Sequence, residues 1–220
     1  MLSWKPLSRR KSDVNKEPVV SFENWLQPRR GDSILDIGCN NGSKVARLHT
    51  AGIFAVGIDV NKEVLKKSTV RGLILADAII LPFKSAVFTK VICTEVLEHV
   101  SSDTKLLAEV ARILKPRGLL FLSTPHSVHS LDCWDPAWLK WKLLNSEHTH
   151  RHYSIVELSK KLASQKLRIE KLQVLFGLSW LILRWFNVFL KYVLRRKKQF
   201  TYKATPDGNF DLVVLARRHN

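Results

Sequence analysis

The chain has 220 residues and a formal net charge of +17 at pH 7. Its length suffices for one domain with a sizeable core, and the charge predicts a polyanionic partner, either nucleic acid or an anionic membrane surface, unless it is only a solvated basic face. Three cysteines without metal-ligand spacing exclude a disulfide framework and favour a reducing, intracellular setting. The first residues lack the apolar core of a secretory signal.

Residues 33–49 predict a strand, a glycine loop and a helix. The apolar run Ser33–Ile37 is followed by a turn with glycines at Gly38 and Gly42, and a helical pattern starts at Ser43. This geometry lets a backbone approach a nucleotide-like ligand, although a ligand-free strand-to-helix turn is the plain alternative. The loop lacks the third glycine of the G-x-G-x-x-G fingerprint, which argues against a dinucleotide oxidoreductase.

The next two predicted strands each lead to an aspartate. Residues 53–59 end in Asp59, and the strand Leu73–Ala76 is followed by Asp77. An acid about 20 residues beyond a glycine loop is suited to accept hydrogen bonds from ribose hydroxyls. Taken singly, each aspartate is also typical of a helix N-cap. The ordered set predicts a ligand site at the carboxyl ends of parallel strands.

Five segments within residues 32–125 carry a family resemblance: ILDIGCNNG, GIDV, ADAIILPF, VICTEVLEHV and ILKPRGLLFLSTP. In this order and spacing they resemble the class I S-adenosylmethionine-dependent methyltransferases, in the branch that modifies quinones and other small molecules. The resemblance implies an α/β fold with a Rossmann-like, doubly wound, seven-stranded sheet, mostly parallel with an antiparallel final strand. It implies S-adenosyl-L-methionine as cofactor and places His99 in a structural motif near it.

The resemblance also implies a cofactor site built from the ends of four strands. The glycine loop would hold the methionine part, the second strand end the ribose, the third the adenine and the fourth the sulfonium. The implied residues are Asp36, Gly38, Cys39, Asn40, Gly42, Asp59, Val60, Asp77, Ala78, Thr94 and Glu95. The family commonly has glycine where Asn40 stands, and asparagine tolerates left-handed backbone angles better than most residues.

The remaining elements complete a single predicted domain, residues 1–220. Its parts are a basic lead that folds over the cofactor (1–31), the cofactor-binding core (32–125) and two acceptor-side insertions (126–153 and 177–208). The elements predicted after the third strand are a core-facing helix Asp103–Leu114, a helix Ile155–Gln165 with a capping box at Ser154, and a hairpin of Arg168–Phe176 and Phe210–Ala216.

Histidines that precede the predicted helix Ile155–Gln165 are candidates for the acceptor side. Residues 147–153 read Glu-His-Thr-His-Arg-His-Tyr, and three interpretations compete. The histidines converge on zinc, for which no further ligand is evident; they serve as a base or bind substrate; or they only lead into the helix. Similar segments border the acceptor site in related methyltransferases. We therefore predict no metal and take His126, His148 and His152 as the candidate catalytic residues.

Residues 178–198 predict an amphipathic helix with a narrow polar stripe. Nearly all its other side chains are large and apolar, so a helix lying in an anionic membrane surface satisfies both faces. A core helix or homodimer contact is the alternative, and a true span would bury charges at about 2.5–3.5 kcal/mol each. The stripe consists of Arg184, Asn187, Lys191, Arg195 and Lys198.

A tryptophan stripe in the first insertion has a similar character. After the helix-start pair Asp135-Pro136, tryptophans recur at helical spacing and alternate with lysines. Such a stripe is often core, and here it suits an interfacial helix or a lid over a hydrophobic acceptor pocket. The tryptophans are Trp134, Trp138 and Trp141.

Together these features predict methyl transfer to a lipid-like or quinone-like small molecule by a cytoplasmic, peripherally membrane-associated enzyme. An RNA (tRNA) methyltransferase is the first alternative, because some share these motifs and the charge suits RNA, but no RNA-binding module is evident. A non-catalytic scaffold that binds a membrane or a partner is the second. The residues leave open whether the acceptor atom is oxygen, nitrogen or carbon.

Overall fold

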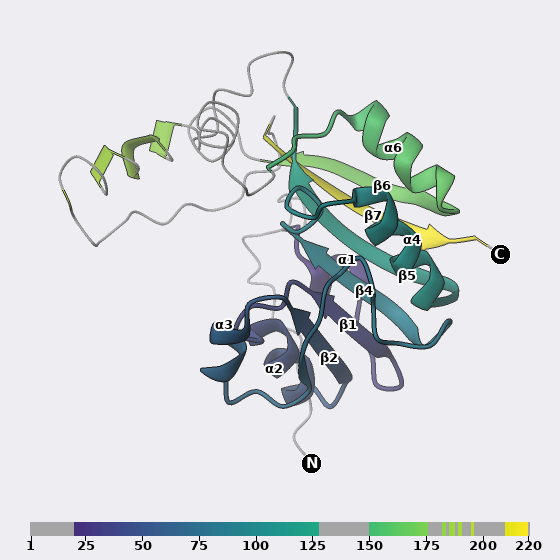
Figure 1. Cartoon of the computed structure of the whole chain (residues 1–220). Helices are drawn as coiled ribbons and strands as arrows, with labels where there is room; N and C mark the ends of the chain where they lie inside the picture. Colours follow the sequence, from purple (N-terminus) through teal and green to yellow (C-terminus); the bar gives the residue numbers. More distant parts are fainter. Residues whose placement is uncertain are drawn as a thin grey trace, which may run out of the picture.

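The computed structural model describes residues 20–127, 150–175 and 210–219, with positions 182–183, 185–187, 189–190 and 195. Strands and helices alternate through most of this part (Figure 1). The strands are β1 (Ser33–Ile37), β2 (Phe54–Asp59), β3 (Leu73–Leu75), β4 (Phe88–Thr94), β5 (Leu114–Pro125), β6 (Leu167–Leu175) and β7 (Asp211–Arg218). The helices are α1 (Phe22–Leu26), α2 (Ser43–Thr50), α3 (Lys62–Lys66), α4 (Asp103–Ile113) and α6 (Ile155–Ser164).

One seven-stranded sheet has the order β3-β2-β1-β4-β5-β7-β6. The strands β1 to β5 pair in parallel, whereas β7 runs antiparallel to both β5 and β6. The predicted mostly parallel sheet with an antiparallel final strand is therefore confirmed. Because parallel strands end at the same edge, the loops after β1, β2, β3, β4 and β5 meet on one side of the molecule.

Helices cover both faces of the sheet and make two cores. On one face α4 and α6 bury leucines against the sheet, and on the other face α1 and α2 bury Phe22, Leu26, Val45 and Leu48. Along β5, Leu120 and Leu122 belong to the first core and Phe121 to the second. A strand buried on both faces needs a nearly continuous apolar sequence, which explains why β5 reads LLFL there.

Element boundaries differ from the predicted ones by one or two residues. Helix α4 stops at Ile113, and Leu114 is already extended with φ −65° and ψ 138°, so β5 follows without a loop. The predicted capping residue at the start of α6 is found, because the Ser154 hydroxyl accepts a hydrogen bond from the Glu157 N–H at 3.1 Å.

Several predicted features lie outside the described residues. They include His148, the three insertion tryptophans, most of the N-terminal lead and much of residues 177–208. The described positions between 182 and 190 are helical. Within the described residues, no helix is both long and apolar enough to cross a bilayer.

Candidate cofactor and acceptor site

The loop after β1 requires the glycine at Gly38. Its φ is +69°, and a Cβ there would lie 2.3 Å from Val96 Cγ2, on the turn that follows β4. The loop therefore packs directly against the neighbouring strand end. Asn40 has φ 50°, so asparagine takes the left-handed conformation that the sequence required of it.

Asp59 ties this loop to the end of β2. Its Oδ2 accepts a hydrogen bond from the Asn40 N–H at 2.8 Å, and its Oδ1 accepts one from the Asn61 N–H at 2.8 Å. The N-cap of α3 is Asn61, so Asp59 is not the helix cap of the alternative interpretation. A carboxylate oxygen accepts more than one hydrogen bond, which leaves capacity for ligand hydroxyls.

Apolar side chains surround the ends of β2 and β3. Asp77 Oδ1 accepts from the Ile79 N–H at 3.0 Å and shapes a turn, and no helix starts there. Close to the two aspartates in sequence, Val60, Leu75 and Ile80 are 69%, 52% and 74% exposed, while Ala78 is buried. Exposed apolar side chains can pack against an aromatic ring, and the neighbouring carboxylates can accept hydrogen bonds from hydroxyls joined to that ring. Leu75 and Ile80 were not among the predicted site residues, although both are apolar neighbours of Asp77 in sequence.

Asp36, near the end of β1, is a buried carboxyl with spare capacity. It is 0% exposed, and its Oδ1 lies 3.4 Å from Lys44 Nζ. Its Oδ2 is buried without a hydrogen-bond partner among the described residues. Burial, partly offset by Lys44, raises the pKa of Asp36 to about 6. A ligand ammonium at this loop would supply the missing donor.

The ends of β4 and β5 form the other side of the site. Glu95 follows Thr94 at the end of β4 and has φ 55°, a strained angle for a residue other than glycine. Its N–H donates to the Ser123 carbonyl at 3.1 Å. Cys39 is buried, and burial raises the pKa of its thiol to about 12, so this sulfur is a packing group.

A carboxyl and several imidazoles gather beyond Glu95. Glu98 is 0% exposed; its Oε2 accepts from Thr124 Oγ1 at 3.2 Å, and its Oε1 lies 3.7 Å from His99 Nε2. Burial, reinforced by the charge of Glu95, holds the pKa of Glu98 well above its usual range. The His99 and His150 ring centroids are 4.9 Å apart. Glu98, Thr124 and this pairing were missed, because only the fold brings them together.

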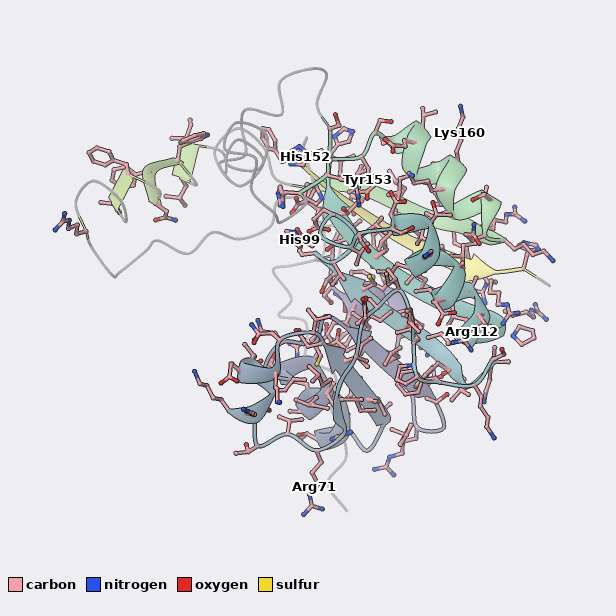
Figure 2. All side chains as sticks on the ribbon, viewed as in Figure 1. Arg71, His99, Arg112, His152, Tyr153 and Lys160 are labelled. Carbon is pink, nitrogen blue, oxygen red and sulfur yellow. The ribbon has the colours of Figure 1, made fainter. Side chains whose placement is uncertain are left out.

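Two of the predicted catalytic histidines border this cluster. The His152 ring lies 5.5 Å from that of His150, and Figure 2 shows His99, His152 and Tyr153 in the same region of the molecule. His126 follows β5 directly and forms a parallel bridge with Tyr153. The fold thus brings His126 and His152 to one edge. Within the described residues, no three His, Cys, Asp or Glu side chains are grouped as metal ligands.

Residues 35–122 match the family model described as "Methyltransferase domain". This stretch contains the glycine loop, both aspartates and Glu95, in the arrangement described above. The chain carries a class I S-adenosylmethionine-dependent methyltransferase domain. The recognition from sequence is therefore confirmed, and S-adenosylmethionine is the cofactor of this enzyme family.

Curated relatives of the methyltransferase domain act on small molecules according to their names. The ubiquinone biosynthesis O-methyltransferase of Xylella fastidiosa is 33% identical over 131 residues, covering 55% of this chain and 53% of that protein. The 27-O-demethylrifamycin SV methyltransferase of Amycolatopsis mediterranei is 32% identical over 130 residues, covering 54% and 48%. The chain thus spans about half the length of the curated relatives it matches.

Solved structures share the fold of the methyltransferase over most of the chain. An S-adenosylmethionine-dependent methyltransferase from Methanosarcina mazei has a TM-score of 0.62 at 21% identity, covering 90% of this chain and 96% of that one. Another from Mesorhizobium loti has a TM-score of 0.63 at 18% identity, covering 86% and 92%. At these identities the likeness establishes the fold alone.

The residues present fit S-adenosylmethionine. The open oxygen of Asp36 suits the ammonium of its methionine part, Asp59 suits ribose hydroxyls, and the apolar side chains around Asp77 suit a purine. When bound, the cofactor supplies a methyl group on a positively charged sulfur, and the chain supplies a carboxylate, Glu95, at the strand end beside the glycine loop.

Proposed function

We propose that the protein transfers a methyl group from S-adenosylmethionine to a hydroxyl oxygen of a small lipid-like or quinone-like acceptor. The observation that carries the proposal is the convergence of Asp36, Asp59, Asp77 and Glu95 at the edge of the sheet within the matched domain. Support for the acceptor class comes from two relatives whose names describe O-methylation of a quinone precursor and of a rifamycin.

Methyl transfer to a hydroxyl mainly requires alignment of the acceptor oxygen with the sulfonium methyl and a group that accepts the hydroxyl proton. A sulfonium methyl is already activated, so holding the acceptor oxygen in line provides much of the rate. A hydroxyl acceptor must also lose a proton, and an imidazole is suited to take it near neutral pH. We assign this role to His126 and His152, with His148 as a further candidate.

We further propose that the acceptor is taken from a membrane surface, through an exposed apolar face. Asn187 and Leu190 are buried, whereas the large apolar side chains near them point outward. The spacing of the exposed residues is i, i+3, i+4 and i+7, which is one side of a helix. They are Ile182, Trp185, Phe186 and Phe189, at 63%, 39%, 45% and 45% exposure.

The pairing of β5, β6 and β7 bears on the domain organisation of the chain. We propose that residues 1–220 act as one domain in which segments 126–153 and 177–208 flank the acceptor. Both segments leave the sheet at its acceptor edge, since Pro125 of β5 pairs with Asp211 of β7 and Asp211 pairs with Leu175 of β6.

Label transfer tests the function. The protein is incubated with methyl-labelled S-adenosylmethionine and a host extract, which is then separated into lipid, RNA and water-soluble fractions. Label in the lipid fraction is the expected result. Label in RNA would replace this proposal by the RNA methyltransferase alternative, and cofactor binding without label in any fraction would favour the scaffold.

Flotation with anionic liposomes tests the membrane part separately. Replacing Trp185, Phe186 and Phe189 by serine should abolish flotation, because interfacial binding scales with buried apolar area. Phe54→Ser is the matched control, since Phe54 is 60% exposed at the start of β2. Equal flotation of the wild type and the triple variant would contradict the membrane proposal and leave methyl transfer untouched.

A further inference from the structure

A hollow lies at the opposite end of the sheet from the cofactor site. It is a cleft of about 770 Å³, named here the arginine cleft. Its volume is in the range of ligand pockets. Its lining residues lie at the start of β5 and β6 and at the end of β7, whereas the candidate site lies at the carboxyl ends of β1 to β5, at the opposite end of these strands (Figure 1). The lining residues are Arg117, Arg168, Ile169, Glu170, Arg217, Arg218 and His219.

Three adjacent strands contribute arginines to this cleft, one each from β5 and β6 and two from β7. Arg168 of β6 is the register partner of Arg217 of β7, and Arg117 belongs to β5. Like charges directly opposite each other on a sheet are destabilising. The Glu170 carboxylate offsets part of this repulsion, because the charges of Arg217 and Arg168 both lower its pKa. A bound anion would offset the remainder.

The single carboxylate that lines the cleft is already engaged. Arg217 holds Glu170 with two donors, Nε to Oε1 and Nη2 to Oε2, the second at 3.0 Å. A third donor, Nη1 of Arg217, reaches the Arg117 carbonyl at 2.9 Å. The guanidinium of Arg217 is thus fixed in place, while among the described residues no ion pair involves Arg117 or Arg168.

We propose that the arginine cleft is a binding site for a soluble phosphate-bearing ligand, held by the guanidinium groups of Arg117 and Arg168 beside the fixed Arg217. Guanidinium forks match phosphate oxygens in geometry and charge, and Arg is preferred for such sites. A concave site at the far end of the sheet from positions 182–190 suits a small soluble anion better than a flat bilayer. The inference is independent of the proposed methyl transfer.

Calorimetric titration of the full chain with pyrophosphate, at constant ionic strength, tests the site. The wild-type protein should bind pyrophosphate, and its melting temperature should be higher in the presence of pyrophosphate. Arg117→Gln with Arg168→Gln should weaken binding by about tenfold or more, as expected for lost charge-assisted hydrogen bonds. Arg168→Lys keeps the charge but loses the fork, and it should weaken binding less. Arg71→Gln is the control, because Arg71 is exposed and lies apart from the cleft (Figure 2).

Glu170→Gln separates a ligand site from a merely structural cluster. It removes the competing negative charge and should tighten pyrophosphate binding, whereas a purely structural role predicts loss of stability with no gain in affinity. Absence of binding by wild type, or equal affinity in the double arginine variant, would overturn the proposal. Binding of an oligoribonucleotide or anionic vesicles through these arginines, without binding of pyrophosphate, would overturn it as well.

Discussion

The Ser123 hydroxyl donates a hydrogen bond to Glu95 Oε1 at 2.6 Å, so the carboxyl ends of β4 and β5 are joined side chain to side chain. The backbone repeats the link, because the Glu95 N–H donates to the Ser123 carbonyl. These two hydrogen bonds, one donated and one accepted by Ser123, hold Glu95 at its left-handed angle and fix the direction of its carboxylate. Ser123 is therefore a positioning residue for the charge at the sulfonium end of the proposed site.

Ser123→Ala should weaken S-adenosylmethionine binding by about tenfold or more, the cost of a hydrogen bond to a charged group. Binding of the demethylated product, S-adenosylhomocysteine, should change less, because its sulfur is uncharged. Calorimetry on both ligands measures the ratio, and Ser123→Thr should restore it. An equal loss for both ligands would mean that Ser123 only supports the fold.

Asp36 should make the ligand-free protein less stable as the pH rises. Its folded pKa of about 6 exceeds the ordinary 3.8, so the folded state keeps a proton that the unfolded chain has released. By linkage, the raised pKa leaves the free energy of unfolding unchanged below pH about 4. Above pH about 6 it lowers that free energy by up to about 3 kcal/mol. Urea unfolding at about pH 5 and about pH 7.5 measures it.

Asp36→Asn provides the comparison for that prediction. The substitution removes the titration, so its effect on unfolding free energy should be more favourable at the higher pH than at the lower. The comparison cancels the titration of groups that do not interact with Asp36. A pH-independent difference between them would show that Asp36 does not change protonation on folding.

Gly38→Ala should destabilise the protein by about 2–4 kcal/mol, because it combines a left-handed angle with overpacking. The new Cβ would meet Val96 Cγ2 at 2.3 Å. Adding Val96→Ala should relieve the overlap but not the backbone strain. The stability lost in Gly38→Ala should therefore be regained only in part. Thermal unfolding of the wild type, the two single variants and the double variant gives a double-mutant cycle. Strictly additive changes in unfolding free energy would show that the two side chains do not interact.

Tyr153→Phe should lower the free energy of unfolding by about 1–2 kcal/mol, because the two acceptors of the buried hydroxyl lose their donor. The Tyr153 side chain is 0% exposed, and its hydroxyl lies 3.1 Å from Asp103 Oδ2 and 3.2 Å from the Leu97 carbonyl. Denaturant unfolding measures the loss, with Asp103→Asn completing a double-mutant cycle. A coupling energy near zero would show that the contact between the hydroxyl and Asp103 does not help to anchor the histidine segment.

The parts of the site that were predictable depend on local spacing. A strand of known period places its last residue at the sheet edge, so the glycine loop, Asp59 and Asp77 follow from their intervals along the chain. The left-handed Asn40 followed from the conformational preference of asparagine. These features need no knowledge of which strands are neighbours.

Apart from Leu75 and Ile80, which are sequence neighbours of Asp77, the features that were missed join distant segments. Glu98 meets Thr124, and Tyr153 meets Asp103, only because β4, β5 and α6 are packed together. The arginine cleft depends on the antiparallel register of β6 and β7 and on an irregularity between Ile169 and Lys171. Periodicity identifies a strand but does not fix its partner or its register, so these arrangements required the fold.

The order of strands has a consequence for synthesis on the ribosome. β6 is made before β7, yet its hydrogen bonds within the sheet run to β7, which separates it from β5. Until residue 218 has emerged, β5 keeps an open edge and β6 has no strand to join. We expect the nucleotide-binding half of the sheet to fold first, while the half that borders the acceptor folds only after residues 211–218 of β7 have been synthesised.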